Sequence, residues 1–173
     1  MRFLSTALAG VTIVEPEPIS DQRGSFARLY CPEEFTRAGI AFVPTQTSLS
    51  FNRARHTLRG MHYCLEPEAK LVRCTRGRIF DVALDLRRDS PTFRHWFGIE
   101  LDPSAARALY IPANVAHGFL TLEPDSDMLY QIDRLYRPGF DAGVRWNDPR
   151  FAIAWPAQPA VIDARDRNYP DFV

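Results

Sequence analysis

The chain has 173 residues, of which 46% are hydrophobic and 24% are charged. These values are typical of one folded domain and exclude a disordered chain. Lys plus Arg and Asp plus Glu both number 21, so the net charge is zero and gives no reason to expect nucleic acid as a partner. No apolar run approaches the roughly twenty residues that cross a bilayer, so we expect no membrane partner.

The first ten residues, MRFLSTALAG, combine one arginine, a short apolar run and a small-residue ending. This composition superficially resembles a signal peptide. The β-branched run VTIV follows directly, so a strand is the alternative interpretation.

Three cysteines occur, an odd number without paired metal-ligand spacing: Cys31, Cys64 and Cys74. We expect them to be reduced thiols that serve mainly in packing, and we expect a cytoplasmic protein.

One short helix is predicted in the stretch CPEEFTRAGI. Pro32 suits a first helical turn, and Glu33 and Glu34 complement the positive end of the helix dipole. Gly39 follows where a helix can end.

Most of the remaining chain predicts β-structure. Residues 78–86, RIFDVALDL, place Phe80, Val82 and Leu84 on one side and Asp81 and Asp85 on the other, which is the period of a half-buried strand. Similar runs occur, separated by turn-forming residues, at 95–101, 107–111, 117–122 and 127–132. This spacing favours an antiparallel sandwich or barrel over β-α-β units. After Trp155 we expect a surface loop with at most one helical turn.

In the predicted strand TLRGMHY, residues 57–63, His62 follows Arg-Gly. The histidine is either a core residue or a functional imidazole, and the glycine supports the second interpretation because strand glycines often mark bulges or ligand approach. Arg59 and His62 are three positions apart and would face opposite sides of a regular strand. If both line one pocket, the strand must contain a bulge at Gly60.

A metal site is an alternative for His62. His62, Cys64 and His117 could together form a soft site. No two histidines have the strand spacing of a His-x-His pair, however. We therefore predict that His62 is a base and that the protein binds no metal.

Other candidates are open to two interpretations from the residues alone. His117, beside Gly118, either lies where a substrate approaches or is structural. Lys70 either faces solvent or points inward and needs an anionic partner. One of Tyr130 and Tyr136 is expected to be a buried aromatic with a bonded hydroxyl.

The carboxylates Asp163 and Asp166, near the C-terminus, are solvated loop residues by default. Sequence spacing alone cannot pair Asp166 with His62, because that pairing depends on the fold.

Several segments carry a resemblance to a known family. They are DQRGSFARLY, LRGMHY, KLVRCTRGRIFDVALDLRRDSPTF, YIPANVAHGFLTL, LYQIDRLYRPGFDAGVRWNDP and AWP. In order and spacing the chain resembles, over about residues 11–166, the dTDP-4-dehydrorhamnose 3,5-epimerases, which are cupin-like enzymes of dTDP-L-rhamnose synthesis that use neither metal nor cofactor.

The resemblance implies an all-β fold, a cupin-like jelly-roll β-sandwich with short peripheral helices, in a single domain of residues 1–173. It also implies a homodimer in which the N-terminal strand joins the partner's sheet, and this disfavours the signal peptide. The segment 156–173 is expected to wrap over the barrel.

The resemblance further implies roles for individual residues in the epimerisation of a dTDP-4-keto-6-deoxy sugar at both carbons that flank the ketone. His62 corresponds to the base, Asp166 to the carboxylate that orients it, Tyr130 to the acid on the opposite sugar face, and Lys70 to the lysine near the developing oxyanion. The implied substrate-binding residues are Arg23, Phe26, Gln46, Ser48, Arg59, His117, Tyr136, Asp141 and Arg165.

Four positions depart from the family pattern: Arg28 stands at a usual glutamate, Ser48 at an asparagine, Cys64 at a glutamine and Gln131 at a lysine. They flank the pocket, so they leave proton transfer possible but put the sugar, the nucleotide and the number of inverted centres in question. Two alternatives therefore remain. One is a single-centre epimerase or ketoisomerase on a related 4-keto sugar nucleotide, and the other is a non-catalytic cupin binding module.

Overall fold

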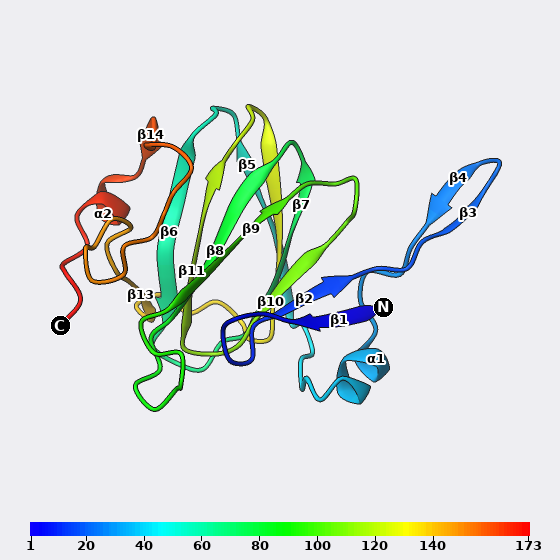
Figure 1. Ribbon diagram of the computed structural model, residues 1–173, viewed down its shortest axis with the longest axis horizontal. Coiled ribbons are helices and arrows are strands. Elements are labelled where there is room, and N and C mark those ends of the chain that lie inside the picture. Colours follow the sequence, from blue (N-terminus) through cyan, green and yellow to red (C-terminus); the bar gives the residue numbers. More distant parts are fainter.

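A computed structural model describes residues 1–173 as two β-sheets packed face to face, with two short helices at the periphery (Figure 1). The elements are β1 (Arg2–Ser5), β2 (Thr12–Glu15), β3 (Ile19–Asp21), β4 (Gly24–Phe26), α1 (Pro32–Arg37), β5 (Gln46–Asn52), β6 (Thr57–Cys64), β7 (Lys70–Arg76), β8 (Ile79–Asp85), β9 (Trp96–Leu101), β10 (Ala108–Ile111), β11 (Val115–Thr121), β12 (Ser126–Ile132), β13 (Asp141–Gly143), β14 (Val161–Ile162) and α2 (Ala164–Arg167).

The first sheet has the strand order β1-β2-β10-β7-β12-β5, and the second has the order β13-β6-β11-β8-β9 with β14 beside β6. All neighbours in these two orders are antiparallel, and the β14–β6 pair is parallel. The predicted all-β sandwich is confirmed, and so are the strands predicted from residue 78 to residue 132.

The main hydrophobic core lies between the two sheets. Alternate residues of facing strands meet there, among them Val72 of β7, Phe119 of β11 and Met128 of β12, all fully buried. Two smaller cores cover the outer faces. One forms around Phe35 of α1, and the other forms where Phe151 of the C-terminal segment packs near Met61 of β6.

Strand β8 differs from the prediction of one buried face, because both of its faces are buried. Val82 and Leu84 point to the outer core, which the C-terminal segment covers. Asp81 and Asp85 are fully buried on the other face. The predicted alternation along β8 is therefore correct, but Asp81 and Asp85 face hydrogen-bonding partners inside the protein and not solvent.

Helix α1 forms as predicted. Pro32 occupies the first turn, and Gly39 adopts a φ of +77°, which is the left-handed conformation that ends many helices. Its Phe35 is buried among Phe3, Tyr30, Phe42 and Tyr110.

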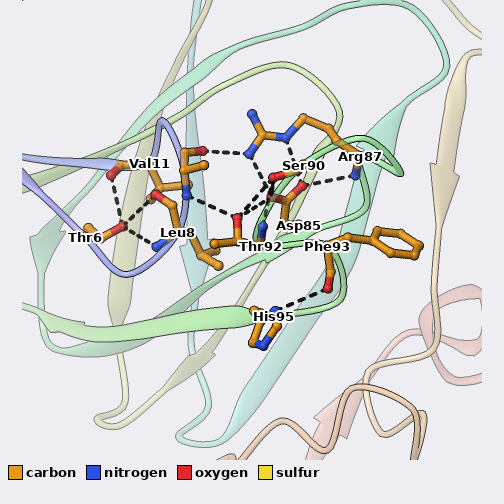
Figure 2. A network of polar contacts seen from close by, with 10 residues as sticks. Thr6, Leu8, Val11, Asp85, Arg87, Ser90, Thr92, Phe93 and His95 are labelled. Atoms are coloured by element: carbon orange, nitrogen blue, oxygen red, sulfur yellow. Dashed lines mark hydrogen bonds and ion pairs between the residues drawn. The ribbon is translucent and has the colours of Figure 1, made fainter.

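A polar network ties the loop between β8 and β9 to the turn between β1 and β2 (Figure 2). Asp85 accepts hydrogen bonds from Arg87, Ser90 and Thr92. Arg87 also donates to the carbonyl of Ala9, and the Ala9 amide donates to Thr92. The buried carboxylate thus joins two segments that are far apart in sequence.

The β3–β4 hairpin projects away from the sandwich (Figure 1). Its two strands pair only with each other. Ile19 and Phe26 are about three-quarters exposed, at 76% and 75%. The hairpin therefore presents apolar side chains with no cover from its own chain.

The C-terminal segment lies along the other end of the molecule (Figure 1). Strand β14 runs beside the first residues of β6, and the single turn α2 follows it. The prediction of a loop with one helical turn after Trp155 is confirmed except for the two-residue strand β14.

Candidate active site

His62 lies on β6 at a break in the regular pairing with β11. His62 is opposite His117, and Arg59 is opposite Phe119, so residues 60 and 61 of β6 both lie opposite the single residue Gly118 of β11. This is the extra residue of a β-bulge. It brings Arg59 and His62 to the same face, and the predicted bulge at Gly60 is confirmed.

Two glycines allow this geometry. Gly60 has a φ of +136°, and a Cβ there would lie 2.5 Å from the Cα of Gly118 on β11. A Cβ on Gly118 would in turn lie 3.1 Å from the Cα of Gly60. The backbones of β6 and β11 are therefore in direct contact at Gly60 and Gly118, where side chains would normally separate two strands.

Asp166 is hydrogen-bonded to His62. Its Oδ1 lies 2.7 Å from Nε2 of His62, and its Oδ2 accepts a bond of 3.0 Å from the amide of Gly60. Burial alone would raise the pKa of Asp166, but the hydrogen bond and charge of His62 and the Gly60 amide hold that pKa below its ordinary value. An ionised carboxylate only accepts hydrogen bonds, so Nε2 carries the proton and Nδ1 of the neutral imidazole keeps a free lone pair.

The single turn α2 delivers this carboxylate. Asp163 caps the turn by accepting a hydrogen bond from the Arg165 amide, and Asp166 on its inner side is only 2% exposed. The two C-terminal aspartates thus differ, because Asp163 is an exposed cap and Asp166 is a buried partner of the histidine.

A second histidine–carboxylate pair lies beside the first. Nε2 of His117 is 2.6 Å from Oδ1 of Asp81, and both residues are buried. The other oxygen of Asp81, Oδ2, is buried without a hydrogen-bond partner. Asp81 was not among the site residues predicted from the sequence, although its place opposite the apolar side of β8 was the signal that could have found it.

Tyr130 faces the histidines from the other sheet. It lies on β12 and packs against the main core, and its ring centroid is 5.8 Å from that of His117. Burial, assisted by the charge of Asp81 and opposed by Arg59, raises the pKa of Tyr130 well above its ordinary value. The phenol is therefore protonated over the whole physiological range and can act as a proton donor.

Lys70 points inward. Val72 and Cys74, two and four residues further along β7, belong to the core between the sheets, so the strand period places Lys70 on the same face. Its Nζ lies 2.9 Å from Oε1 of Glu68. The anionic partner that an inward lysine requires is therefore Glu68. Register also makes Lys70 a diagonal neighbour of Tyr130.

A groove of about 670 Å³ opens along β6 toward α2. Arg59, His62, Arg165 and Asp166 line it together with residues of β14. Nε of Arg59 donates to the buried Asn52 over 2.8 Å. Arg59 and Arg165 offer two guanidinium groups to an anion in this groove, beside the carboxylates of Asp163 and Asp166.

Several of the expected binding residues lie around one mouth of the sandwich. Gln46 and Ser48 are two apart on β5, and Gln46 accepts a hydrogen bond from the amide of Tyr136. A hydrogen bond with Asp141 raises the pKa of Tyr136. Ser48 on β5 is also the register partner of Tyr130 on β12. The residues at this mouth are therefore next to the buried Tyr130.

Arg23 and Phe26 are not brought to this site. Both belong to the projecting hairpin, where Arg23 pairs with Asp21 at 2.5 Å and Phe26 is exposed. Within one chain they contribute nothing to the groove.

The alternative metal site finds no support in the geometry. No group of three or more His, Cys, Asp or Glu side chains has an arrangement that could hold a metal ion. The three proposed ligands have other partners: each histidine faces an aspartate, and Sγ of Cys64 lies 3.2 Å from Nη1 of Arg134. No helix is long and apolar enough to cross a membrane.

Comparisons with known proteins agree on one family. Residues 5–173 match the family model described as dTDP-4-dehydrorhamnose 3,5-epimerase. A protein of that name from Methanothermobacter thermautotrophicus is 40% identical over 174 residues, which cover 97% of this chain and 92% of the relative. A dTDP-4-dehydrorhamnose 3-epimerase from Streptomyces niveus is 35% identical, with 97% and 82% covered. The crystal structure of the 3,5-epimerase from Elizabethkingia anophelis superimposes with a TM-score of 0.95 at 33% identity, covering 99% of this chain and 96% of that one.

Proposed function

The chain belongs to the dTDP-4-dehydrorhamnose 3,5-epimerase family, and from this membership we propose that it inverts both carbons flanking the ketone of a dTDP-4-keto-6-deoxy sugar. It is an isomerase with the cupin-like fold of that family, and its substrate is a nucleotide sugar. The observation that carries the mechanism is the contact between His62 on β6 and Asp166 on α2, with Tyr130 on the opposing sheet.

His62 acts as the base in the first step. A hydrogen next to a ketone is a very weak acid, and an imidazole with a reference pKa of about 6.5 removes it only if the enolate is stabilised as it forms. The C–H electron pair moves into the enolate, and the proton moves to Nδ1 of His62. Asp166 then stabilises the imidazolium through Nε2.

Lys70 supplies the positive charge for the enolate oxygen. Its inward orientation and its position near Tyr130 support this role. Glu68 keeps the ammonium paired while no oxyanion is present. Formation of the enolate would give Lys70 a second anionic partner.

Tyr130 returns a proton to the carbon from the opposite face. Its raised pKa keeps the phenol protonated, and its place on the opposing sheet suits delivery to the face away from His62. Afterwards His62 loses its proton and Tyr130 regains one, so the enzyme is unchanged. The same pair can serve both carbons beside the ketone.

Arginines hold the diphosphate. Arg59 and Arg165 line the groove beside the base, and guanidinium groups bind phosphate oxygens in bidentate fashion. Gln46, Ser48, Tyr136 and Asp141 complete the binding residues around the mouth of the sandwich, and the buried His117 completes them from inside.

We propose a homodimer as the functional form. The N-terminal strand β1 pairs with β2 of its own chain, so the projecting β3–β4 hairpin is the candidate for the exchanged element. Its uncovered apolar residues Ile19 and Phe26 support this assignment, as does the exposed Phe51 on the edge strand β5. In such a dimer Arg23 and Phe26 would reach the site of the second copy. Sedimentation of the wild type and of Phe26→Asp tests the dimer, since a monomeric wild type would contradict it.

A single-centre activity is the second candidate, because a relative at 35% identity is named a 3-epimerase. The deciding experiment incubates the protein with dTDP-4-keto-6-deoxyglucose in deuterated water and determines by proton NMR which ring carbons acquire deuterium. Deuterium at carbons 3 and 5 with inversion supports the proposal. Deuterium at one carbon supports the second candidate, and its absence at both refutes proton-transfer catalysis.

The cytoplasm is the proposed compartment. All three cysteines are free, which fits a reducing environment.

A further inference from the structure

Tyr169 lies against the imidazole of His62. The two ring centroids are 6.2 Å apart and the ring planes are inclined by 71°, so the edge of one ring meets the face of the other. Tyr169 is half-buried and follows Asp166 by three residues. His62 therefore contacts the C-terminal segment twice, through Nε2 to Asp166 and through its ring to Tyr169.

Gly143 provides the space for this contact. It lies on β13 as the direct register partner of His62. A Cβ at residue 143 would be 2.3 Å from Cε2 of Tyr169, far inside any normal contact distance. The tyrosine ring thus fills the place that a side chain on β13 would occupy next to the histidine.

The segment that carries Tyr169 is anchored on both sides. Before it, β14 pairs with the start of β6. After it, Asp171 forms an ion pair of 2.6 Å with Arg145, and the amide of Phe172 donates to Asp148 over 2.6 Å. The ring is therefore held by its own backbone as well as by its contact with His62.

Tyr169 is uncharged at this position. Burial raises the pKa of its hydroxyl, Arg165 opposes that effect, and the carboxylate of Asp166 adds to it. A neutral ring does not compete with Asp166 for the imidazolium.

We propose that Tyr169 is a positioning residue, which holds the imidazole of His62 in line with Asp166 and keeps water away from the hydrogen bond between them. The inference rests on the proposed role of His62 as base. A single hydrogen bond at Nε2 fixes one atom of the ring and leaves the imidazole free to tilt. The flanking ring removes that freedom, and a misplacement of about 1 Å can cost roughly a hundredfold in rate.

The first test compares Tyr169→Ala and Tyr169→Phe in the epimerisation assay. Tyr169→Ala should lower kcat by roughly ten- to a hundredfold and leave KM within about threefold, because the ring acts on the base and not on the substrate. Tyr169→Phe should restore kcat, because it keeps the ring. Arg167→Ala, an exposed change two residues before Tyr169 in the same segment, is the matched control with no expected effect. A normal kcat in Tyr169→Ala, or equal losses in both tyrosine variants, would overturn the proposal.

The second test observes the hydrogen bond directly. In protein with ¹⁵N-labelled histidine, the Nε2 proton of His62 should give a downfield resonance that exchanges slowly with water. Tyr169→Ala should broaden it by faster exchange, and Tyr169→Phe should preserve it. An equally sharp signal in Tyr169→Ala contradicts the proposal even if that variant is less active. If Tyr169→Ala does not fold, Tyr169→Leu replaces it with the same expectations.

His62→Ala in the same assay separates this inference from the proposed function. If His62→Ala retains exchange of substrate hydrogen with solvent, the proposed function fails. If His62→Ala is inactive while Tyr169→Ala is normal, only the positioning role fails.

Discussion

His62 and His117 lie opposite each other on neighbouring strands, and each has its own buried aspartate, yet their accessibility differs widely. The side chain of His62 is 33% exposed, and that of His117 is 4% exposed. A base must reach the substrate hydrogen, so the exposed imidazole is the one suited to proton removal. The buried pair His117–Asp81 instead lies beside His62 on the neighbouring strands, with almost no access from solvent.

Replacing His62 by alanine should therefore abolish catalysis of hydrogen exchange. We expect a loss of at least about a hundredfold, the usual contribution of a positioned base. Deuterium incorporation from solvent measures this step, and nucleotide binding should remain nearly unchanged. His95→Ala is the matched control, because His95 is exposed and its side chain hydrogen-bonds only to the Phe93 carbonyl. Exchange at the wild-type rate in His62→Ala would remove this residue from its role.

Asp166→Asn should impair the same step without removing the backbone contact. The amide oxygen of asparagine can still accept from the Gly60 amide, but the charge that stabilises the imidazolium is lost. We expect kcat to fall by about a hundredfold or more, with a smaller effect on the dissociation constant of the nucleotide. A variant with wild-type kcat would show that the carboxylate charge plays no part.

Tyr130→Phe should separate proton removal from completed inversion. The variant should still exchange substrate hydrogen, because His62 is intact, while formation of inverted product falls more steeply. Because the pKa of Tyr130 is raised, the phenol remains an acid up to at least about pH 10, and the wild type should show no loss of proton donation below that pH. Tyr63→Phe, on the outer face of β6, is the control. Equal losses of exchange and inversion would weaken the assignment.

Arg59→Ala should weaken binding of the nucleotide diphosphate. The loss of one charge-assisted phosphate contact corresponds to about 1.5 to 3 kcal/mol. Calorimetric titration with dTDP measures the change directly, and Arg37→Ala on α1 provides an exposed arginine away from the groove. An unchanged dissociation constant in Arg59→Ala would contradict the phosphate contact.

Asp85→Asn should destabilise the fold while leaving the chemistry of the site intact. Asp85 is fully buried and accepts from Arg87, Ser90 and Thr92, so loss of its charge should lower the free energy of unfolding by about 3 kcal/mol. Urea titration measures this change.

The acid dependence of that stability has a defined sign. Burial would raise the pKa of Asp85, but its hydrogen bonds lower it well below the value of about 3.9 in the unfolded chain. The carboxylate therefore contributes its full stabilisation above about pH 4 and loses it as the pH falls toward the folded-state pKa. Asp85→Asn should flatten the dependence below pH 4, and an unchanged slope would contradict the linkage.

The sequence predicted much of the sandwich because hydrophobic alternation and turn residues act locally. It also predicted the bulge, since Arg59 and His62 cannot share a face of a regular strand. Long-range pairs were different. No local pattern could reveal that Asp166 reaches His62 across more than a hundred residues; that expectation came from the family resemblance.

The acidic residues of β8 show where local reasoning fails. Asp81 and Asp85 alternate with apolar residues, a pattern that predicts a half-buried strand, and isolated carboxylates are rarely buried. Their partners, His117 on β11 and Arg87 in the following loop, satisfy them inside the protein. Tyr169 was missed for a similar reason, because its contact depends on the missing side chain of Gly143.

The contact between Gly60 and Gly118 restricts how this pocket can be redesigned. A methyl group at either position would push β6 and β11 apart and turn the imidazole and the neighbouring guanidinium in different directions. Mutant libraries meant to alter sugar preference should therefore keep both glycines and Tyr130 fixed and diversify other positions of β5 and β12 on the opposing sheet. A methyl group at residue 60 or 118 cannot be offset by a smaller residue on the facing strand, because the facing residue is already glycine.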